Sequence, residues 1–216
     1  MGELRVLLGD DHTMLRHGLR KILEECRDWH VVAEAGNGRD AVRDAVALRP
    51  DVAILDIAMP QLTGIEATRQ IVGRAPSVRI VILSMHSDRA YVTQAMQAGA
   101  RGYVLKESAG DELIAAIDAV ASGKTYLSPP VAHMMEADLR RGQNDKGLLD
   151  RYESLSERER EVLQLVAEGR SSKEIADMLS FSPATVETHR THVLQKLGLK
   201  NTTEVVLYAA RRRIIS

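Results

Sequence analysis

The feature that most constrains the fold is an alternation, along the first half of the chain, of short apolar runs with longer segments of helical periodicity. Five runs rich in Val, Ile and Leu are predicted strands: 5–8, 29–35, 52–55, 79–83 and 102–105. Apolar residues every three or four positions predict helices over 13–26, 39–48, 64–74, 89–98 and 111–122, the last opening with a capping box from Ser108 to Asp111. This alternation predicts a doubly wound α/β domain around a five-stranded parallel sheet.

After residue 122 the alternation stops. The polar, turn-rich stretch 124–150 indicates a linker, with a short amphipathic helical piece at 131–139. Four helical segments follow, each with a start signal: capping boxes at Ser156 with Glu159 and at Ser171 with Glu174, Ser182 before Pro183, and Asn201. We therefore predict an α/β domain over 1–123, a linker over 124–150 and a smaller all-α domain of four helices over 151–216.

Net charge gives a misleading first impression of the binding partners. The chain has 29 Lys and Arg against 30 Asp and Glu, and this balance argues against a nucleic-acid binder when it is taken over the whole chain. From Gly169 onward, however, the sequence has 8 basic and 4 acidic residues. A local basic surface is therefore expected in the last quarter of the chain.

Cysteine usage and apolar runs bear on the cellular compartment. The single cysteine, Cys26, continues a helical series of apolar residues, so we expect a buried core thiol in a reducing cytosol. The N-terminus lacks a basic segment followed by a long apolar one, and no apolar run approaches the length of a membrane span. We predict a cytoplasmic protein with neither signal peptide nor membrane contact.

Polar residues stand where the predicted strands end, namely Asp10, Asp11, Asp56, Ser84 and Lys106. The carboxyl ends of parallel strands share one edge of the sheet, where such folds bind ligands. Three carboxylates crowded there repel one another unless a cation lies among them, and hard oxygen ligands suit Mg²⁺. Taken singly, each residue has a plainer explanation, such as a helix cap for Asp11, a turn at Asp56, a loop hydroxyl at Ser84 or a solvated pair of Lys106 with Glu107.

The residue types also exclude two common uses of such a site. A nucleotide or flavin site would need an anion cradle where this chain has two carboxylates after the first strand. A phosphatase of the haloacid dehalogenase type needs a second acid two residues after its nucleophile, and Ala58 stands there. The remaining use of such a site is a carboxylate that accepts a phosphoryl group and becomes an aspartyl phosphate.

The chain resembles two-component response regulators of the NarL/FixJ family over essentially its whole length. The matching segments are 10–11, 56–60 followed by Gly64, Ser84, 102–106 and 182–190. The resemblance implies a flavodoxin-like receiver domain followed by a LuxR-type helix-turn-helix domain. It further implies that Asp56 is the phosphoacceptor and that Asp10, Asp11, Asp56 and the Ala58 carbonyl hold Mg²⁺.

The same resemblance implies roles for the rest of the pocket. Lys106 would pair with the phosphoryl group, Ser84 would hydrogen-bond it, and Tyr103 would be the aromatic residue that changes rotamer on activation. The alternative for Tyr103 is a half-buried strand aromatic. Glu107 follows Lys106 where many receivers have proline, so no cis peptide bond is expected at that position.

In the second half, 173–179 and 183–197 are spaced as the two helices of a helix-turn-helix. The expected core is Ile175, Ala176, Leu179, Val186, Val193 and Leu197. The face predicted to enter the major groove carries Glu187, Thr188, Thr191 and Gln195, and the candidates for phosphate contacts are Lys173, Thr185, Arg190, His192, Lys196 and Lys200. Two alternatives stay open, that Arg190 lies along the edge of the core and that His189 is a packing residue. Because some relatives have Lys at the position of Glu187, their base preferences are not carried over.

The last helix, 202–212, displays Val205, Val206, Tyr208 and Ala209. The resemblance implies a dimer contact through it, and core packing of the same residues is the rival. We expect a non-enzymatic, phosphorylation-controlled regulator that accepts a phosphoryl group from a sensor histidine kinase and binds promoter DNA as a homodimer, with RNA polymerase a possible further partner. The alternatives are a regulator controlled by another ligand or partner and a Mg²⁺-dependent phosphatase.

Overall fold

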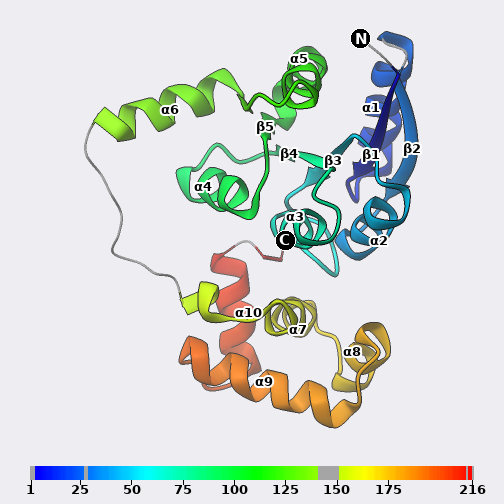
Figure 1. Ribbon diagram of the computed structural model, residues 1–216. Coiled ribbons are helices and arrows are strands. Elements are labelled where there is room, and N and C mark those ends of the chain that lie inside the picture. The colour runs from blue at the N-terminus through cyan, green and yellow to red at the C-terminus, as the bar shows by residue number, and fades with distance from the viewer. Residues whose placement is uncertain (1–2, 27–28, 141–150, 213, 216) are drawn as a thin grey trace. The chain divides into compact units, whose positions relative to one another are not determined.

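The protein is described by a computed structural model that covers residues 3–26, 29–140, 151–212 and 214–215 (Figure 1). The chain divides into two compact units, Met1–Gln143 and Asn144–Ser216, which are described separately below. The side chain of Cys26, predicted to be buried, and residues 141–150 of the predicted linker lie outside the described residues. No helix in the described ranges is both long and apolar enough to cross a membrane.

The first unit is built on one parallel sheet with the strand order β2-β1-β3-β4-β5-β6. The strands are β1 Leu4–Gly9, β2 Trp29–Ala35, β3 Val52–Asp56, β4 Arg79–Ser84, β5 Gly102–Leu105 and β6 Tyr126–Leu127. Every residue of the central strand β3 is buried, as expected where helices cover both faces of a sheet. The predicted doubly wound fold is confirmed, with one strand more than the five expected.

Helices cover both faces of this sheet (Figure 1). They are α1 Thr13–Cys26, α2 Gly38–Leu48, α3 Gly64–Arg74, α4 Arg89–Ala98 and α5 Ala109–Ala121, while α6 Pro129–Arg140 packs against α4. Leu23 of α1 and Ile117 of α5 belong to one buried apolar cluster, and Val42 of α2, Ile71 of α3 and Val92 of α4 belong to the other. The alternating pattern of the sequence therefore produces two cores, one on each face, and leaves the strand ends free for a site.

The predicted capping box at the start of α5 is wrong. Lys106–Ser108 forms a turn of 3-10 helix, α5 begins at Ala109, and the Ser108 side chain makes no cap bond. The Ser108 hydroxyl instead donates to the Leu105 carbonyl at 3.3 Å. The side chain is therefore oriented toward the end of β5 by a local bond and makes no cap bond at the start of α5.

Part of the predicted linker belongs to the first unit. β6 pairs in parallel with β5, with Tyr126 beside Gly102 and Leu127 beside Tyr103. In α6, the helix expected at 131–139, the Val131 side chain is fully buried in the core cluster that also contains α4. The linker pattern reflects the polar composition of this segment, while pairing with an open sheet edge decides its structure.

The second unit is all-α, as predicted. It consists of a 3-10 turn η2 Arg151–Ser154 and the helices α7 Glu157–Ala167, α8 Ser172–Leu179, α9 Pro183–Leu197 and α10 Thr202–Arg211. Both predicted capping boxes are present, and Ser182 and Asn201 cap α9 and α10. The six residues expected in the core are all buried. Start signals in the sequence therefore located these helices within a few residues.

Candidate functional site

The acidic pocket forms where β1, β3 and β5 end. The ammonium of Lys106 lies 2.7 Å from Oδ2 of Asp10 and 2.8 Å from Oδ2 of Asp56. Asp10 and Asp56 are only 2% and 3% exposed, so this ion triad is shielded from water. The sequence expectation that these three side chains meet at one edge of the sheet is met.

Backbone packing holds Asp56 in this position. Gly64 opens α3 so close to the end of β3 that a Cβ on it would lie 2.0 Å from the Asp56 carbonyl oxygen, which explains the glycine. The amide of Gly64 also donates to the Ile57 carbonyl at 2.9 Å. Ala58 approaches through its backbone and hydrogen-bonds the Asp56 carboxylate. The loop after β3 is therefore closely fitted around the acid.

The pocket carries more negative than positive charge. Asp11, one third exposed, lies at the rim, and ligand atoms from Asp10, Asp11, His12 and Asp56 lie within 4.8 Å of one another. Burial raises the pKa of the Asp56 carboxyl above its ordinary value, while the ion pair with Lys106 opposes that rise. One ammonium does not neutralise three carboxylates, so the set fits a divalent cation with hard oxygen ligands.

His12 is a pocket residue that the sequence reasoning did not include. Its Nδ1 lies 3.0 Å from Oδ1 of Asp10 and 2.8 Å from Oδ1 of Asp11, and its backbone amide donates to Asp10 Oδ1 at 2.8 Å. The sequence feature that could have indicated this role is the position of His12 directly after the two aspartates. The His12 amide therefore orients the Asp10 carboxylate, and the imidazole lies between the two aspartates.

Ser84 and Tyr103 lie next to the ion triad. The Ser84 hydroxyl is buried and accepts a hydrogen bond from the His86 amide at 3.0 Å. The Tyr103 ring is fully buried, and its hydroxyl donates to the His86 carbonyl at 2.6 Å. Burial raises the pKa of Tyr103 to about 12, and a hydrogen bond with Ser84 partly opposes that rise. Tyr103 therefore already occupies the inward position, and the alternative of a half-buried strand aromatic is wrong.

The predicted linker reaches the strand that carries Tyr103. The Ser128 amide donates to the Tyr103 carbonyl at 2.9 Å, and the Ser128 hydroxyl accepts from the Leu105 amide at 3.0 Å. That hydroxyl also donates to Oε2 of Glu112 in α5. Ser128 is fully buried and was missed because a lone serine before two prolines carries no signal of its own.

A second candidate site lies on the helix-turn-helix of the second unit. On α9, Thr185, Glu187, Thr188, Thr191 and Gln195 are exposed, as predicted for a helix face that reads DNA. Lys173 on α8 and Lys200 after α9 are exposed as well. The hydroxyls of Thr188 and Thr191 donate back to the Ala184 and Glu187 carbonyls, at 3.0 and 2.9 Å, so their lone pairs remain open to donors.

Three candidates for phosphate contacts have partners inside the domain. Arg190 donates to the Ser172 hydroxyl at 2.6 Å and to the Thr202 hydroxyl at 3.1 Å, and so links α8, α9 and α10. Lys196 lies 2.7 Å from Oε2 of the buried Glu159. The alternative that Arg190 lies along the edge of the core agrees with this arrangement. Contacts of these residues with phosphates remain predictions.

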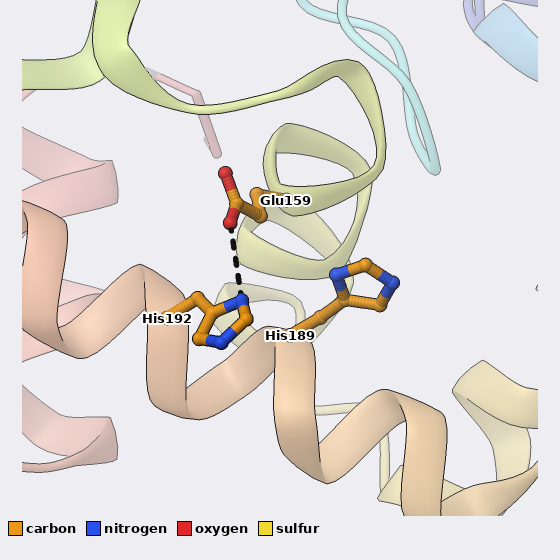
Figure 2. Close-up of side chains that lie close together, drawn as sticks. All are labelled: Glu159, His189 and His192. Carbon is orange, nitrogen blue, oxygen red and sulfur yellow. Dashed lines mark ion pairs between the residues drawn. The ribbon is translucent and has the colours of Figure 1, made fainter.

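His189 and His192 point toward α7 (Figure 2). His189 is half-buried and stacks on Phe181 with ring centroids 5.5 Å apart, which agrees with its alternative as a packing residue. Nδ1 of His192 lies 3.5 Å from Oε1 of Glu159, and the His192 side chain is 49% exposed. His192, the third candidate for a phosphate contact, therefore faces a carboxylate on one side and solvent on the other.

The predicted dimer surface on α10 needs correction. Val205 and Ala209 are 3% and 0% exposed, because they pack into the core of the second unit. They are not available to a second chain. Val206 and Tyr208 are half-buried, and Leu207, which the sequence reasoning left out, is 52% exposed. The sequence pattern does not distinguish the inner from the outer side of a short helix whose two sides are both apolar.

Comparison with known proteins identifies both units. Residues 6–118 match the response regulator receiver domain, and residues 153–209 match the bacterial regulatory proteins of the luxR family. The chain is 37% identical over 215 residues to the oxygen regulatory protein NreC of Staphylococcus carnosus, covering 98% of this chain and 99% of the relative. It is 36% identical over 221 residues to the transcriptional regulatory protein DegU of Brevibacillus brevis, covering 95% and 92%.

Solved structures of response regulators are similar to this chain as well. The structure of a complex of the two-component response regulator RcsB with DNA matches with a TM-score of 0.60 and 29% identity, covering 97% of this chain and 98% of that one. A LuxR-family response regulator from Aurantimonas sp. SI85-9A1 matches with a TM-score of 0.62 and 37% identity over 64% of this chain and 99% of that one.

A receiver domain followed by a LuxR-type helix-turn-helix defines a class of protein, the response regulators with a DNA-binding domain. The chain belongs to the NarL/FixJ family of two-component response regulators.

Proposed function

We propose that this regulator accepts a phosphoryl group on Asp56 from a sensor histidine kinase and thereby controls its own binding to promoter DNA. The observation that carries the proposal is the buried ion triad, in which Lys106 lies within 2.8 Å of both Asp10 and Asp56. A buried carboxylate held beside an ammonium, at the ligand-binding edge of the sheet, is suited to become an acyl phosphate.

The residues of the pocket have distinct parts in this transfer. A carboxylate oxygen of Asp56 attacks the phosphorus of the phosphohistidine; a P–O bond forms as the P–N bond breaks, and the histidine leaves with the electron pair and takes up a proton. Lys106 moves from carboxylate to phosphoryl oxygens, and Ser84 donates to one of them. Asp10, Asp11, Asp56 and the Ala58 carbonyl would hold Mg²⁺, which would supply positive charge next to the phosphoryl group.

The structure supports a specific link from Asp56 to the rest of the receiver. The Ser84 hydroxyl accepts a hydrogen bond from the His86 amide, and the Tyr103 hydroxyl donates one to the His86 carbonyl. A Ser84 hydroxyl recruited by phosphoryl oxygens leaves Tyr103 held in its inward position by the hydrogen bond to the His86 carbonyl. The altered surface comprises α4, β5 and α5, and we propose that it either forms a dimer contact or releases the DNA-binding domain.

DNA recognition is proposed to use α9. Exposed Glu187, Thr188 and Thr191 face the bases of the major groove, while Lys173 and Thr185 contact phosphates. A homodimer would present two such helices to half-sites about one helical turn apart. For the dimer contact through α10 we propose Val206, Leu207 and Tyr208, because Leu207 is exposed.

Phosphotransfer is tested by incubating the protein with a small acyl phosphate and Mg²⁺ and measuring its intact mass. We expect one phosphoryl adduct on the wild type and on Asp111→Ala, an exposed control, and no adduct on Asp56→Ala. A wild type without any adduct would favour a regulator controlled by another ligand. Catalytic turnover of unrelated phosphoesters would favour the phosphatase alternative.

The DNA and dimer assignments are tested separately. Binding to a selected operator is measured before and after phosphorylation, with the oligomeric state followed by sedimentation. We expect phosphorylation to raise operator affinity and dimer content, and we expect Leu207→Glu to weaken the dimer while leaving the adduct intact. An affinity of the phosphorylated protein equal to that of Asp56→Ala would contradict the proposed switch.

A further inference from the structure

The second unit brings two imidazoles and a carboxylate together, away from the acidic pocket. Glu159 of α7 and His189 and His192 of α9 each offer one ligand atom, and the three atoms lie within 4.8 Å of one another (Figure 2). The two histidines stand three residues apart on one helix, so their side chains share a face. This cluster contains nitrogen ligands from two histidines, whereas the acidic pocket is dominated by carboxylates.

Within the described part of the chain, the short contacts of the Glu159 carboxylate are made by Oε2. Oε2 accepts from the Ser156 amide at 2.7 Å and pairs with Lys196 at 2.7 Å. Oε1 faces Nδ1 of His192 at 3.5 Å. Burial by itself would raise the pKa of Glu159, but the hydrogen bonds from Lys196 and Ser156 outweigh it and lower that pKa below its ordinary value. The carboxylate is therefore ionised, oriented, and able to offer Oε1 to a further cation.

The ring of His189 gives a second, independent reason to expect a ligand at this cluster. Its Nδ1 is buried and has no hydrogen-bond partner within the described part of the chain. Stacking on Phe181 fixes the ring, with a centroid separation of 5.5 Å and an interplanar angle of 30°. Buried polar atoms nearly always have a partner, and an orphaned ring nitrogen beside a carboxylate calls for one. Figure 2 shows a nitrogen of this ring on the side of Glu159.

We propose that Glu159, His189 and His192 bind a divalent transition-metal ion, with Zn²⁺ as the fitting example. Two imidazole nitrogens and one carboxylate oxygen are ordinary zinc ligands, and three protein ligands leave a fourth position for water. Tetrahedral zinc needs ligand atoms about 3.4 Å apart, so the cluster requires only small side-chain movements.

The surroundings match a metal site beyond its ligands. A ligating carboxylate is usually hydrogen-bonded through its second oxygen, and Ser156 and Lys196 do this for Glu159. The Lys196 ammonium lies 2.7 Å from Oε2, whereas His192 faces Oε1, so the lysine and the proposed ion use different oxygens of the carboxylate. The side chain of His192 is half exposed, which gives the ion access from solvent.

The test is a Zn²⁺ titration of the full chain by calorimetry, with excess Mg²⁺ present to occupy the acidic pocket. We expect the wild type and His133→Gln, an exposed histidine of α6 used as control, to bind one Zn²⁺ more than His192→Gln. Loss of this ligand is expected to weaken the site by at least about tenfold, the effect of losing even an outer partner of a ligand. Equal stoichiometry and affinity for wild type and His192→Gln would overturn the proposal and leave His189 as a packing residue.

A spectroscopic measurement identifies the ligands. Co²⁺ in a four-coordinate nitrogen and oxygen site absorbs visible light strongly, whereas Co²⁺ among six oxygen ligands absorbs weakly. We expect the strong band in the wild type and in His133→Gln, and its loss in both His189→Gln and His192→Gln. His192 is half exposed, so its variant should fold, which circular dichroism verifies. A strong band that persists in His192→Gln would contradict the assignment.

Discussion

The hydroxyl of Tyr103 donates a hydrogen bond to the backbone carbonyl of His86, with 2.6 Å between the two oxygens. This bond ties β5 to the loop after β4, within the receiver domain. Because Ser84, the last residue of β4, accepts a hydrogen bond from the His86 amide, Ser84 and Tyr103 are coupled through His86 in this structure.

Removing the Tyr103 hydroxyl tests how much this hydrogen bond contributes to stability. Tyr103→Phe is expected to lower the free energy of unfolding of the first unit by about 1 kcal/mol, because the partly buried His86 carbonyl loses a hydrogen bond. Trp29 is the only tryptophan and is buried in β2, so its fluorescence during urea unfolding reports on this unit. Tyr126→Phe, which removes a longer bond of 3.3 Å to Glu112, should have a smaller effect. An unchanged midpoint for Tyr103→Phe would contradict the expectation.

Replacing Lys106 is expected to strengthen binding of Mg²⁺ to the acidic pocket. The ammonium lies 2.7 Å from Asp10 and 2.8 Å from Asp56, where it competes with any other cation. Unit charges about 4 Å apart interact by about 4 kcal/mol at the effective dielectric constant of about 20 that also describes buried sites, so Lys106→Met should tighten Mg²⁺ binding by about tenfold or more. Calorimetric titration measures this affinity, with the exposed Lys124→Met as control. Weaker Mg²⁺ binding in Lys106→Met would show that the lysine does not compete with the ion.

The stability of the second unit should depend on the charge of Glu159. Because its pKa is lowered in the folded state, its contribution is present above the unfolded pKa, ordinarily 4.5, and is lost as the pH falls through the folded pKa. Glu159→Gln is expected to lower the free energy of unfolding by about 2 kcal/mol at pH 7, since the cap and the Lys196 pair are weakened.

This difference should shrink below pH 4.5 and should appear in far-ultraviolet circular dichroism but not in Trp29 fluorescence, since Trp29 lies in the first unit. Asp177→Asn, an exposed change on α8, serves as control and should behave as the wild type at every pH. A stability difference for Glu159→Gln that stays constant down to low pH would rule out the ionised carboxylate as its cause.

The roles proposed for Lys173 and Thr191 predict different binding defects. Lys173→Ala should weaken binding equally for all DNA sequences and reduce the salt slope by about 1, because a phosphate contact carries no sequence information. Thr191→Val should leave the slope unchanged and alter base preference, with a cost of about 1 to 3 kcal/mol on the preferred site. Salt titrations and in-vitro selection separate the two. A change of base preference in Lys173→Ala would reverse the assignment.

The sequence alone is sufficient to predict that Asp10, Asp56 and Lys106 lie close together. Each follows a short apolar strand, and the connection rules of a doubly wound sheet place the ends of those strands side by side. The same holds for the helix starts of the second unit, because a capping box is a local interaction between residues three positions apart.

What could not be foreseen depends on contacts between distant residues. Lys196 lies on an exposed helical position by periodicity, yet it pairs with Glu159, which is 37 residues away in the sequence. Val205 and Ala209 follow the same apolar pattern whether they face the core or a partner chain. A two-residue strand such as β6 is too short to show any alternation, and only the free edge of β5 decides its pairing.

That short strand also affects how the protein can be divided. Cutting the chain after Gly123, where the alternating pattern ends, would remove β6 and leave the backbone amides and carbonyls of β5 as a bare edge, a template for unwanted strand addition. Cutting after Arg140 would keep the edge covered and would retain Val131 in the core. The smallest receiver fragment that stays monodisperse at high concentration should therefore include β6 and α6.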